Sequence, residues 1–332
     1  MADTPDTREI TYLEAVREAL WEEMKTDESV FVLGEDVGAY GGAFKITEGF
    51  LEEFGEDRVI DTPISEAAIV GASIGAAHMG FRPVAEMQFI DFIAPAFDMI
   101  VNFAAKVRYR TGQGAPLVIR GPCGGGARAG PFHSQMVESY FANVAGLKMV
   151  APATVRDAKG LLRAAIRDPD PVLYFEHKLL YRRLKEELPA DEEIDVPLGR
   201  ARIDREGGDL TIVTYSAMVH RAREAAEILS EEDGVEAEIV DLRSLRPLDA
   251  DTVARSVRKT GRPLILHEAP RFGGFAGEIA ARICEEAFEW LDAPIRRVAA
   301  LDTPVPYSPP LEDYYLPQVE DVVTAARWLM AY

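Results

Sequence analysis

The chain has 332 residues, of which 48% are hydrophobic, so it can bury a sizeable core and is long enough for about two domains. This composition excludes a disordered or fibrous protein, and the net charge of −20 disfavours binding to a nucleic-acid backbone. No apolar run approaches the roughly 20 residues that span a bilayer, and the first ten residues lack the basic start and apolar core of a signal peptide. We therefore expect a cytoplasmic protein with no membrane and no nucleic-acid partner.

The first half of the chain alternates strand patterns with helix patterns, which is typical of a parallel α/β sheet. In chain order we expect strands in SVFVLGED (29–36), DRVIDTP (57–63) and RPVAEMQF (82–89), with a helix at 65–79 before the last of them. Apolar residues then recur at helical spacing from 91 to 109, which predicts one long core helix. Further strands are expected in PLVIRGP (116–122), LKMVAP (147–152) and PVLYFEH (171–177), with a helix at 154–167 between the last two.

The second half begins after a charged, proline-bearing stretch (182–199) that has no sustained period and is typical of a linker. A second series of strand and helix patterns follows. Its strands are expected in LTIVTYS (210–216), VEAEIVDL (235–242), RPLILHEA (262–269) and IRRVAAL (295–301), with helices beginning near 218, 248 and 274 and a closing helix at 319–329. These patterns predict an α/β protein with domains 1–185 and 200–332, joined by a linker at 186–199.

Glu66 is the first candidate for a functional residue. It follows a strand and turn (59–65) and begins a helix rich in small apolar residues. In an open parallel sheet, ligands bind at that position, beyond the carboxyl ends of the strands. A first-turn carboxylate can instead serve only to complement the helix dipole, and spacing alone favours this structural role.

The Gly-rich stretch GPCGGGARAGPFHSQ (121–135) is a second candidate, because glycines allow a backbone to approach a ligand closely. Near its end lies His133, a residue type that serves acid–base chemistry or substrate binding and is as often a structural loop residue. Ser134 lacks the Gly-x-Ser-x-Gly setting of a hydrolase nucleophile. The remaining Gly-rich segments match neither the dinucleotide fingerprint nor a Walker loop, which disfavours a dehydrogenase with its own NAD site.

Ten blocks occur in this order along the chain: FVLGEDVG, YGGAFKITEGF, DTPISEAAIVG, RPVAEMQFIDFIAPAFDMIVNFAAKVRYR, HSQ, LKMVAP, DAKGLL, LLYR, DLRSLRPLD and HEAPRFGGF. Taken together, they resemble the beta subunits of the decarboxylating components of 2-oxo acid dehydrogenases. They extend over almost the whole chain. The resemblance implies a transketolase-like pyrimidine-binding domain followed by a transketolase C-terminal domain, in agreement with the two series of strands and helices.

By this resemblance, Glu66 corresponds to the glutamate that hydrogen-bonds the aminopyrimidine ring of thiamine diphosphate. A carboxyl group there shares a proton with the ring and favours the imino tautomer, which activates the thiazolium carbon for attack on a 2-oxo acid. The resemblance also assigns Gln88 and Phe92 to the cofactor, with Phe92 standing where branched-chain members can carry a tyrosine. His133 corresponds to the active-site histidine of the HSQ motif, which is expected to assist substrate binding and transfer to the lipoyl arm.

A potassium site is a further implication, since some relatives hold this ion with backbone carbonyls. Here the matching residues are Leu117, Val118, Ala165, Asp168 and Asp170. The sequence DPDP (168–171) is equally compatible with a charged turn between a helix and a strand.

The chain contains no Gly-Asp-Gly, the motif that together with a downstream asparagine holds Mg²⁺ and the diphosphate in thiamine enzymes. The resemblance therefore implies that a separate alpha subunit supplies the diphosphate and Mg²⁺ site, in a heterotetramer of two alpha and two beta chains. It also implies a lipoyl-carrying acyltransferase core as partner, and acidic residues of the C-terminal domain would suit a basic docking domain.

The substrate stays open between branched-chain 2-oxo acids and pyruvate, because the substrate pocket depends partly on the alpha subunit. An acetoin dehydrogenase beta subunit is an alternative in the same family, favoured by FEHKLLY (175–181) and TYSAMVH (214–220). A noncatalytic assembly subunit is the alternative of another class, disfavoured by the presence of Glu66 and His133. The missing Gly-Asp-Gly motif disfavours a single-chain transketolase-type enzyme.

Overall fold

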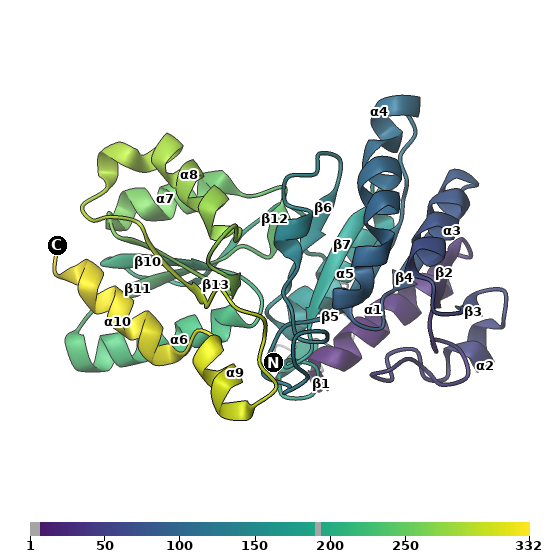
Figure 1. Cartoon of the computed structure of the whole chain (residues 1–332), viewed down its shortest axis with the longest axis horizontal. Coiled ribbons are helices and arrows are strands. Elements are labelled where there is room, and N and C mark those ends of the chain that lie inside the picture. The colour runs from purple at the N-terminus through teal and green to yellow at the C-terminus, as the bar shows by residue number, and fades with distance from the viewer. Residues whose placement is uncertain (1–6, 190–193) are drawn as a thin grey trace, which may run out of the picture. The chain divides into compact units, whose positions relative to one another are not determined.

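The structure of the chain, a computed structural model, describes residues 7–189 and 194–332. It divides into two compact units, one formed by 1–123 and 143–198 and the other by 124–142 and 199–332 (Figure 1). We call them the first unit and the second unit and describe each by itself. The domain bounds 1–185 and 200–332 and the linker 186–199 stay predictions, and positions 190–193 of that linker lie outside the described residues.

Parallel strands form the sheet of the first unit, where their order is β6-β7-β5-β4-β2-β3. Every residue of β2, β5 and β7 is buried, as expected when continuous apolar runs lie in a parallel sheet that is covered on both faces. The strands and the parallel arrangement predicted for this half are confirmed. Their bounds are β2 (Val30–Gly34), β3 (Val59–Asp61), β4 (Arg82–Glu86), β5 (Val118–Cys123), β6 (Lys148–Val150) and β7 (Val172–His177).

Helices α1 (Tyr12–Thr26) and α5 (Val155–Arg167) pack against each other and are joined by ion pairs. The ammonium of Lys159 on α5 lies 3.1 Å from a carboxylate oxygen of Glu18 and 2.6 Å from one of Glu22, both on α1. Helix α5 confirms the helix predicted at 154–167. The two other regular helices before the long helical segment are α2 (Phe50–Phe54) and α3 (Glu66–His78), and α3 confirms the helix predicted at 65–79.

The segment predicted as one long core helix at 91–109 is helical but interrupted. Pro95 lies inside its first part, where the missing N–H prevents a regular α-helical hydrogen bond. Phe97 and Phe103 are exposed, so the segment is not wholly in the core. The prediction of an uninterrupted core helix is therefore wrong, and the observed pieces are the 3₁₀-helix η1 (Ile90–Ala96), the π-helix η2 (Met99–Phe103), the 3₁₀-helix η3 (Ala104–Lys106) and α4 (Val107–Thr111).

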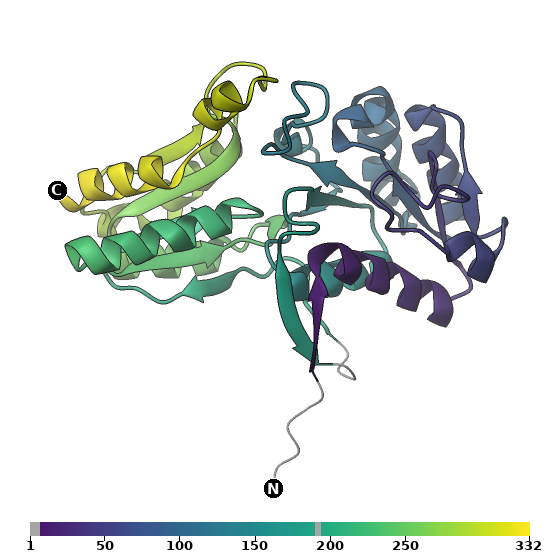
Figure 2. The same ribbon diagram turned by 90° about the horizontal axis from the view of Figure 1, so that it is seen from below.

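A small antiparallel sheet completes the first unit, formed by β1 (Thr7–Thr11) and β8 (Lys185–Pro189). In Figure 2 the purple strand β1 runs beside the teal strand β8. Strand β8 falls within the stretch that the sequence predicted to be irregular. Beyond the undescribed positions, Val196 is buried, and its side chain lies where a Cβ on Gly160 of α5 would stand, so this part of the stretch is packed rather than solvated.

The second unit contains a sheet in the order β14-β13-β10-β11-β9, in which only β9 is antiparallel to its neighbour. Helices α7 and α8 lie on one face of this sheet and α6 and α10 on the other (Figure 1). The strands and the closing helix predicted for this half are confirmed. The strands are β9 (Arg202–Arg205), β10 (Leu210–Thr214), β11 (Ala237–Asp241), β12 (Ser244–Arg246), β13 (Pro263–Pro270) and β14 (Arg296–Ala300). The helices are η4 (Glu138–Tyr140), α6 (Met218–Ile228), η5 (Leu229–Asp233), α7 (Ala250–Thr260), α8 (Ala276–Ala287), η6 (Phe288–Trp290), α9 (Pro309–Tyr315) and α10 (Val319–Met330).

No helix within residues 7–189 and 194–332 is both long enough and apolar enough to cross a membrane.

Candidate active site

Acidic and amide side chains gather where three neighbouring strands of the first unit end. Glu35 and Asp36 follow β2, Glu66 follows β3 after a short turn, and Gln88 follows β4. The side-chain amide of Gln88 donates a hydrogen bond of 3.2 Å to the Asp36 carboxylate. Because these strands are parallel neighbours, their carboxyl ends meet at one edge of the sheet, where ligands bind in open α/β folds.

Glu66 is the first residue of α3 and is only partly buried. Among the described residues its carboxylate accepts no hydrogen bond and forms no ion pair, which leaves both oxygens available to a donor from outside. A carboxylate that only complemented a helix dipole would not need this partly enclosed position. The geometry therefore fits a hydrogen-bonding partner for a ligand N–H group.

Glu35 is a site residue that the sequence did not single out. Its side chain is 7% exposed, and burial raises the pKa of this carboxyl, with the negative charges of Glu66 and Asp36 adding to the shift. The shift shows that Glu35 and Glu66 are within electrostatic reach of each other. An acidic residue directly after a fully apolar strand was the signal in the sequence that could have identified it.

A buried ion network stands beneath this edge of the sheet. The guanidinium of Arg120, which is fully buried in β5, donates to both carboxylate oxygens of Glu176, at 2.5 and 2.6 Å, and its third nitrogen donates to Glu86. The Tyr181 hydroxyl donates to Glu176 at 2.6 Å. Burial raises the pKa of Glu86, although the Arg120 charge opposes that rise. The network ties β4, β5 and β7 together directly below the loops that carry the site.

Aromatic rings continue from this network toward Phe92, which is partly buried in η1. The ring of Phe92 lies edge-on to Phe89 with centroids 6.0 Å apart, Phe89 lies 5.6 Å from Phe44, and Phe44 lies 5.2 Å from Tyr181. A chain of edge-on and tilted rings supports a flat heteroaromatic group well, because their faces and edges offer complementary charge.

His133 belongs to the second unit, in the Gly-rich loop 124–135. A hydrogen bond of 3.0 Å from the Gly124 N–H to the Gln135 carbonyl closes the base of this loop, and the His133 N–H donates to the Gly130 carbonyl at 3.3 Å. The His133 side chain is partly buried. Glu66 and His133 are therefore each placed within their own unit.

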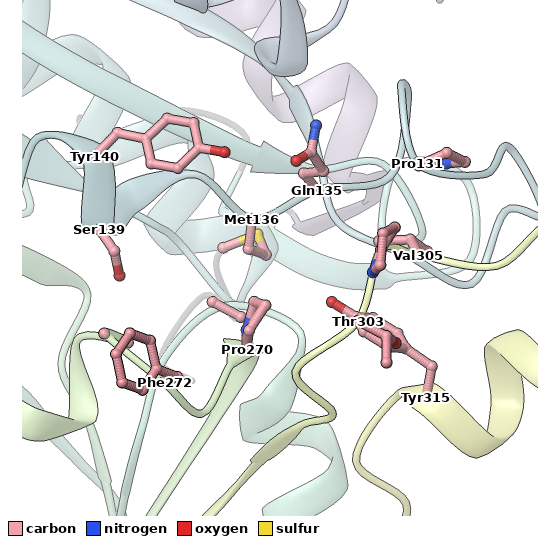
Figure 3. Close-up of a pocket in the computed structure, with 14 residues that line it drawn as sticks. Pro131, Gln135, Met136, Ser139, Tyr140, Pro270, Phe272, Thr303, Val305 and Tyr315 are labelled. Atoms are coloured by element: carbon pink, nitrogen blue, oxygen red, sulfur yellow. The ribbon is translucent and has the colours of Figure 1, made fainter.

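A pocket of about 380 Å³ lies in the second unit beside this loop. Figure 3 shows Gln135 and Tyr140 on one side of it and Phe272, Thr303 and Tyr315 on the other. Its lining combines aromatic rings, prolines and small apolar residues with a few polar groups, which is typical of pockets for small organic groups. The lining residues are Pro131, Gln135, Met136, Ser139, Tyr140, Ala269, Pro270, Phe272, Gly273, Gly274, Thr303, Pro304, Val305 and Tyr315.

Two buried titratable groups adjoin the lining of this pocket. Glu138, next to Ser139, is fully buried, accepts a hydrogen bond of 2.6 Å from the Tyr215 hydroxyl, and has its pKa raised to about 7 by burial. The His267 ring lies against Gly274, and burial, helped by the charge of Arg297, lowers the pKa of this imidazole to about 4. At neutral pH the imidazole is therefore uncharged, while Glu138 is close to half protonated.

The two aspartates assigned to potassium are engaged by cationic side chains. Asp168 receives the ammonium of Lys148 at 2.7 and 2.6 Å, and Asp170 receives the Arg108 guanidinium at 2.5 Å. Positive charges at these distances compete with a bound cation for the same oxygens.

The carbonyls assigned to potassium also have partners in part. The Leu117 carbonyl accepts from the Val172 N–H at 3.0 Å, and the Ala165 carbonyl accepts from the Asp168 N–H at 3.3 Å. Each carbonyl oxygen keeps a second lone pair, and Val118 lies next to Leu117 at the start of β5. The potassium site stays a prediction. In the described part of the chain, no three His, Cys, Asp or Glu side chains gather in an arrangement that could hold a metal ion.

A parallel sheet with acidic groups at its carboxyl edge, followed by a second α/β unit, is the arrangement of a transketolase-like protein, and the family matches identify the chain as one. The family described as "Transketolase, pyrimidine binding domain" matches residues 8–183, and "Transketolase, C-terminal domain" matches 199–322. Among solved structures, the chain is similar to "Split gene transketolase, inactive beta4 tetramer", with a TM-score of 0.77, 25% identity, and coverage of 97% of this chain and 98% of that one. The predicted two-domain α/β fold is confirmed.

Relatives of known name identify the family within this class. The chain is 50% identical to "2-oxoisovalerate dehydrogenase subunit beta" of Bacillus subtilis, over 97% of this chain and 99% of the relative. It is 46% identical to "Pyruvate dehydrogenase E1 component subunit beta" of the same organism, over 98% and 99%, and 49% identical to a mitochondrial pyruvate dehydrogenase E1 beta subunit of Arabidopsis thaliana, over 96% and 89%. The chain therefore belongs to the E1 beta subunits of 2-oxo acid dehydrogenases, a thiamine-diphosphate-dependent family. The resemblance found in its sequence is confirmed.

Proposed function

We propose that this chain is a catalytic beta subunit that takes part in the oxidative decarboxylation of a 2-oxo acid and in the reductive acylation of a lipoyl group. The observation that carries the proposal is the Glu66 carboxylate, which is partly buried, has no partner among the described residues, and lies within electrostatic reach of the protonatable Glu35 at the carboxyl edge of the sheet. A purely structural subunit has no need for two carboxyl groups held close together without a cation. This argues against the noncatalytic alternative.

The first unit offers the groups that an aminopyrimidine ring requires. Glu66 would accept a hydrogen bond from a ring nitrogen and share its proton, Gln88 would offer amide contacts, and Phe92 would pack against the ring. Bound thiamine diphosphate would supply the nucleophilic carbon and the electron sink for decarboxylation. The contribution of the chain is to hold a proton at the Glu66 oxygens and to keep the ring fixed.

His133 would act on the substrate and on acyl transfer rather than on the cofactor ring. Its loop forms one wall of the 380 Å³ pocket through Pro131 and Gln135, so the imidazole belongs to a segment that borders space for a small organic group. A histidine there can donate a hydrogen bond to a carboxylate or carbonyl oxygen of the substrate.

A separate alpha subunit would complete the site. The chain has no Gly-Asp-Gly motif for Mg²⁺ and the diphosphate. Ile64 and Met79, which flank α3, are 82% and 79% exposed, and the exposed side of α3 itself carries alanines at 67, 68 and 72. A helix that is apolar on its exposed side is typical of a subunit interface. The solved split-gene transketolase beta tetramer is named as inactive, which supports the proposal that a beta chain alone lacks part of its site.

The remaining assignments follow the same proposal. Relatives that act on 2-oxoisovalerate and on pyruvate stand at similar identity, so the proposed substrate is a 2-oxo acid of either kind, and the acetoin alternative gains no support from them. The acyltransferase core as partner, the two-alpha, two-beta heterotetramer, Mg²⁺ at the alpha subunit and the cytoplasmic location stay predictions.

The test replaces Glu66 by glutamine in the complex reconstituted with an alpha subunit. We expect Glu66→Gln to slow hydrogen–deuterium exchange at the thiazolium C2 of bound cofactor about 100-fold or more, because an amide cannot exchange the proton. The matched control is Glu52→Gln, an exposed first-turn carboxylate of α2, which should leave exchange unchanged. If Glu66→Gln exchanges as fast as the unmodified chain, the proposed role of Glu66 is refuted.

A further inference from the structure

The Gly-rich loop 124–135 is bound by carboxylates of its own unit. The N–H of Gly125 donates to Glu268 at 2.6 Å, the N–H of Gly126 donates to one oxygen of Glu312 at 2.9 Å, and the N–H of Arg128 donates to the other at 3.1 Å. Successive amides that point to one side form the kind of concave site that usually binds an anion. Here the anions belong to the protein.

Glu312 is buried to an unusual degree for a carboxylate. It is 0% exposed, on α9, and its charge is met by the Arg128 guanidinium at 3.0 Å in addition to the two amides. The same guanidinium donates to the Pro309 carbonyl at 2.9 Å and to the exposed Asp313 carboxylate at 2.7 Å. A carboxylate that has lost its water is stable only while such partners are held in place, so the loop and α9 constrain each other.

Arg128 and Gly130 of the loop have a left-handed backbone conformation next to the contact with Glu312. Arg128 has a φ of +62°, a left-handed conformation that a non-glycine residue adopts only when its surroundings fix it. Gly130 has a φ of +71°, and a Cβ there would stand 2.1 Å from the Tyr307 ring. The loop therefore has no space to shift toward Tyr307, and its tip is held by Glu312.

We infer that Glu312, together with Glu268, is a positioning residue that holds the loop so that His133 faces its substrate. Four residues separate Arg128 from His133, and the hydrogen bond from Gly124 to Gln135 closes the loop just beyond the histidine. Movement released at Arg128 would therefore be transmitted to the imidazole. This inference rests on the role proposed above for His133.

The first experiment measures hydrogen exchange in the purified full-length chain by mass spectrometry. Glu312→Gln keeps the size of the side chain but replaces one accepting oxygen by an NH₂ group, which faces a backbone N–H donor and cannot bind it. We therefore expect the backbone amides in a peptide covering 124–130 to exchange hydrogen at least tenfold faster. The matched control is Asp313→Asn, which removes only the charge of the exposed contact to Arg128 and should leave these amides unchanged. Unchanged exchange in Glu312→Gln would overturn the inference.

A second variant covers the case in which Glu312→Gln does not fold. Arg128→Gly removes the guanidinium, and glycine adopts the left-handed conformation without strain. It should raise exchange in 124–130 by a smaller factor, because the two amide contacts to Glu312 remain. Exchange as slow as in the unmodified chain would again overturn the inference.

The second experiment is a double-mutant cycle in the complex reconstituted with an alpha subunit, with reductive acylation of a lipoyl domain as the readout. We expect Glu312→Gln to lower the turnover number about tenfold, and the double variant with His133→Ala to be no slower than His133→Ala alone, because Glu312 acts through the histidine. If the double variant loses turnover by the product of the two single losses, the positioning role of Glu312 is overturned and the role of His133 is not. A silent His133→Ala would instead refute the proposed role of His133, and the positioning inference with it.

Discussion

Glu138 offers a direct test of the electrostatics of the second unit. This fully buried carboxyl group accepts a hydrogen bond from the Tyr215 hydroxyl, and burial raises its pKa from 4.5 to about 7. Replacement by glutamine preserves the size of the side chain and an oxygen for the Tyr215 hydroxyl. It removes only the titration.

The expected magnitude follows from the shift. Below pH 4.5 the carboxyl is neutral in both the folded and the unfolded chain, whereas between pH 4.5 and 7 only the unfolded chain loses the proton. The free energy of unfolding therefore falls as the pH rises through this window, by about 3 kcal/mol for a shift of this size at 1.36 kcal/mol per unit. Glu138→Gln should abolish that fall, so the variant should gain about 3 kcal/mol relative to the unmodified chain between pH 4.5 and 7.5.

His267 shifts stability in the opposite direction over nearly the same range. Its pKa is lowered from 6.5 to about 4, so the unfolded chain takes up the extra proton and stability is lost as the pH falls through this window. In the unmodified chain the contributions of Glu138 and His267 to the pH dependence of the free energy of unfolding offset each other. In Glu138→Gln the His267 contribution stands alone, and the variant should become steeply less stable below pH 6.5.

The measurement is urea unfolding of both proteins at pH 4.5, 6 and 7.5, with Glu320→Gln on the exposed side of α10 as the control. Contributions from other titrating groups are common to both proteins and cancel in the difference. A difference between Glu138→Gln and the unmodified chain that stays constant within about 1 kcal/mol across these pH values would refute the buried, proton-binding state of Glu138.

Two further predictions concern stability. Arg120→Met should cost about 3–5 kcal/mol in urea unfolding, because Glu86 and Glu176 would be left buried without their cation, and a loss below about 1 kcal/mol would show that the network is solvated. Asp249→Ala should cost about 1 kcal/mol, since the Asp249 carboxylate caps α7 by accepting the Thr252 N–H at 3.1 Å, and an unchanged unfolding midpoint would contradict this capping role.

Strands were predictable from the sequence because a strand that is buried on both faces has a nearly continuous run of apolar residues. β2, β5, β10 and β13 are short apolar runs bounded by Gly, Pro or charged residues, and each was located within a few residues. The interruptions of the helical segment at 90–111 were not predictable in this way. An apolar period of 3.6 residues cannot distinguish an α-helix from successive 3₁₀ and π turns, and Pro95 was the one local signal against a regular helix.

Some of the site residues could likewise be located from the sequence, and others could not. Glu66 was located by its place between a strand and a helix, and its role came from resemblance. Glu35 was missed, although it directly follows an apolar strand, because its significance depends on a neighbouring strand that brings Glu66 near. Glu138 lies in a short 3₁₀ turn, and its raised pKa depends on burial that one sequence does not display.

The Gly-rich loop has hydrogen-bond partners that its sequence did not indicate. From sequence, its glycines indicated close approach to a ligand. The amides of Gly125 and Gly126 instead bind carboxylates that lie 143 and 186 residues further along the chain. An external anion would have to displace Glu268 and Glu312 from these amides and leave buried carboxylates without partners, at a cost of several kcal/mol. Under the proposed function, ligand contact is left to the far end of the loop, where Gln135 borders the pocket, and the glycines hold His133 in place.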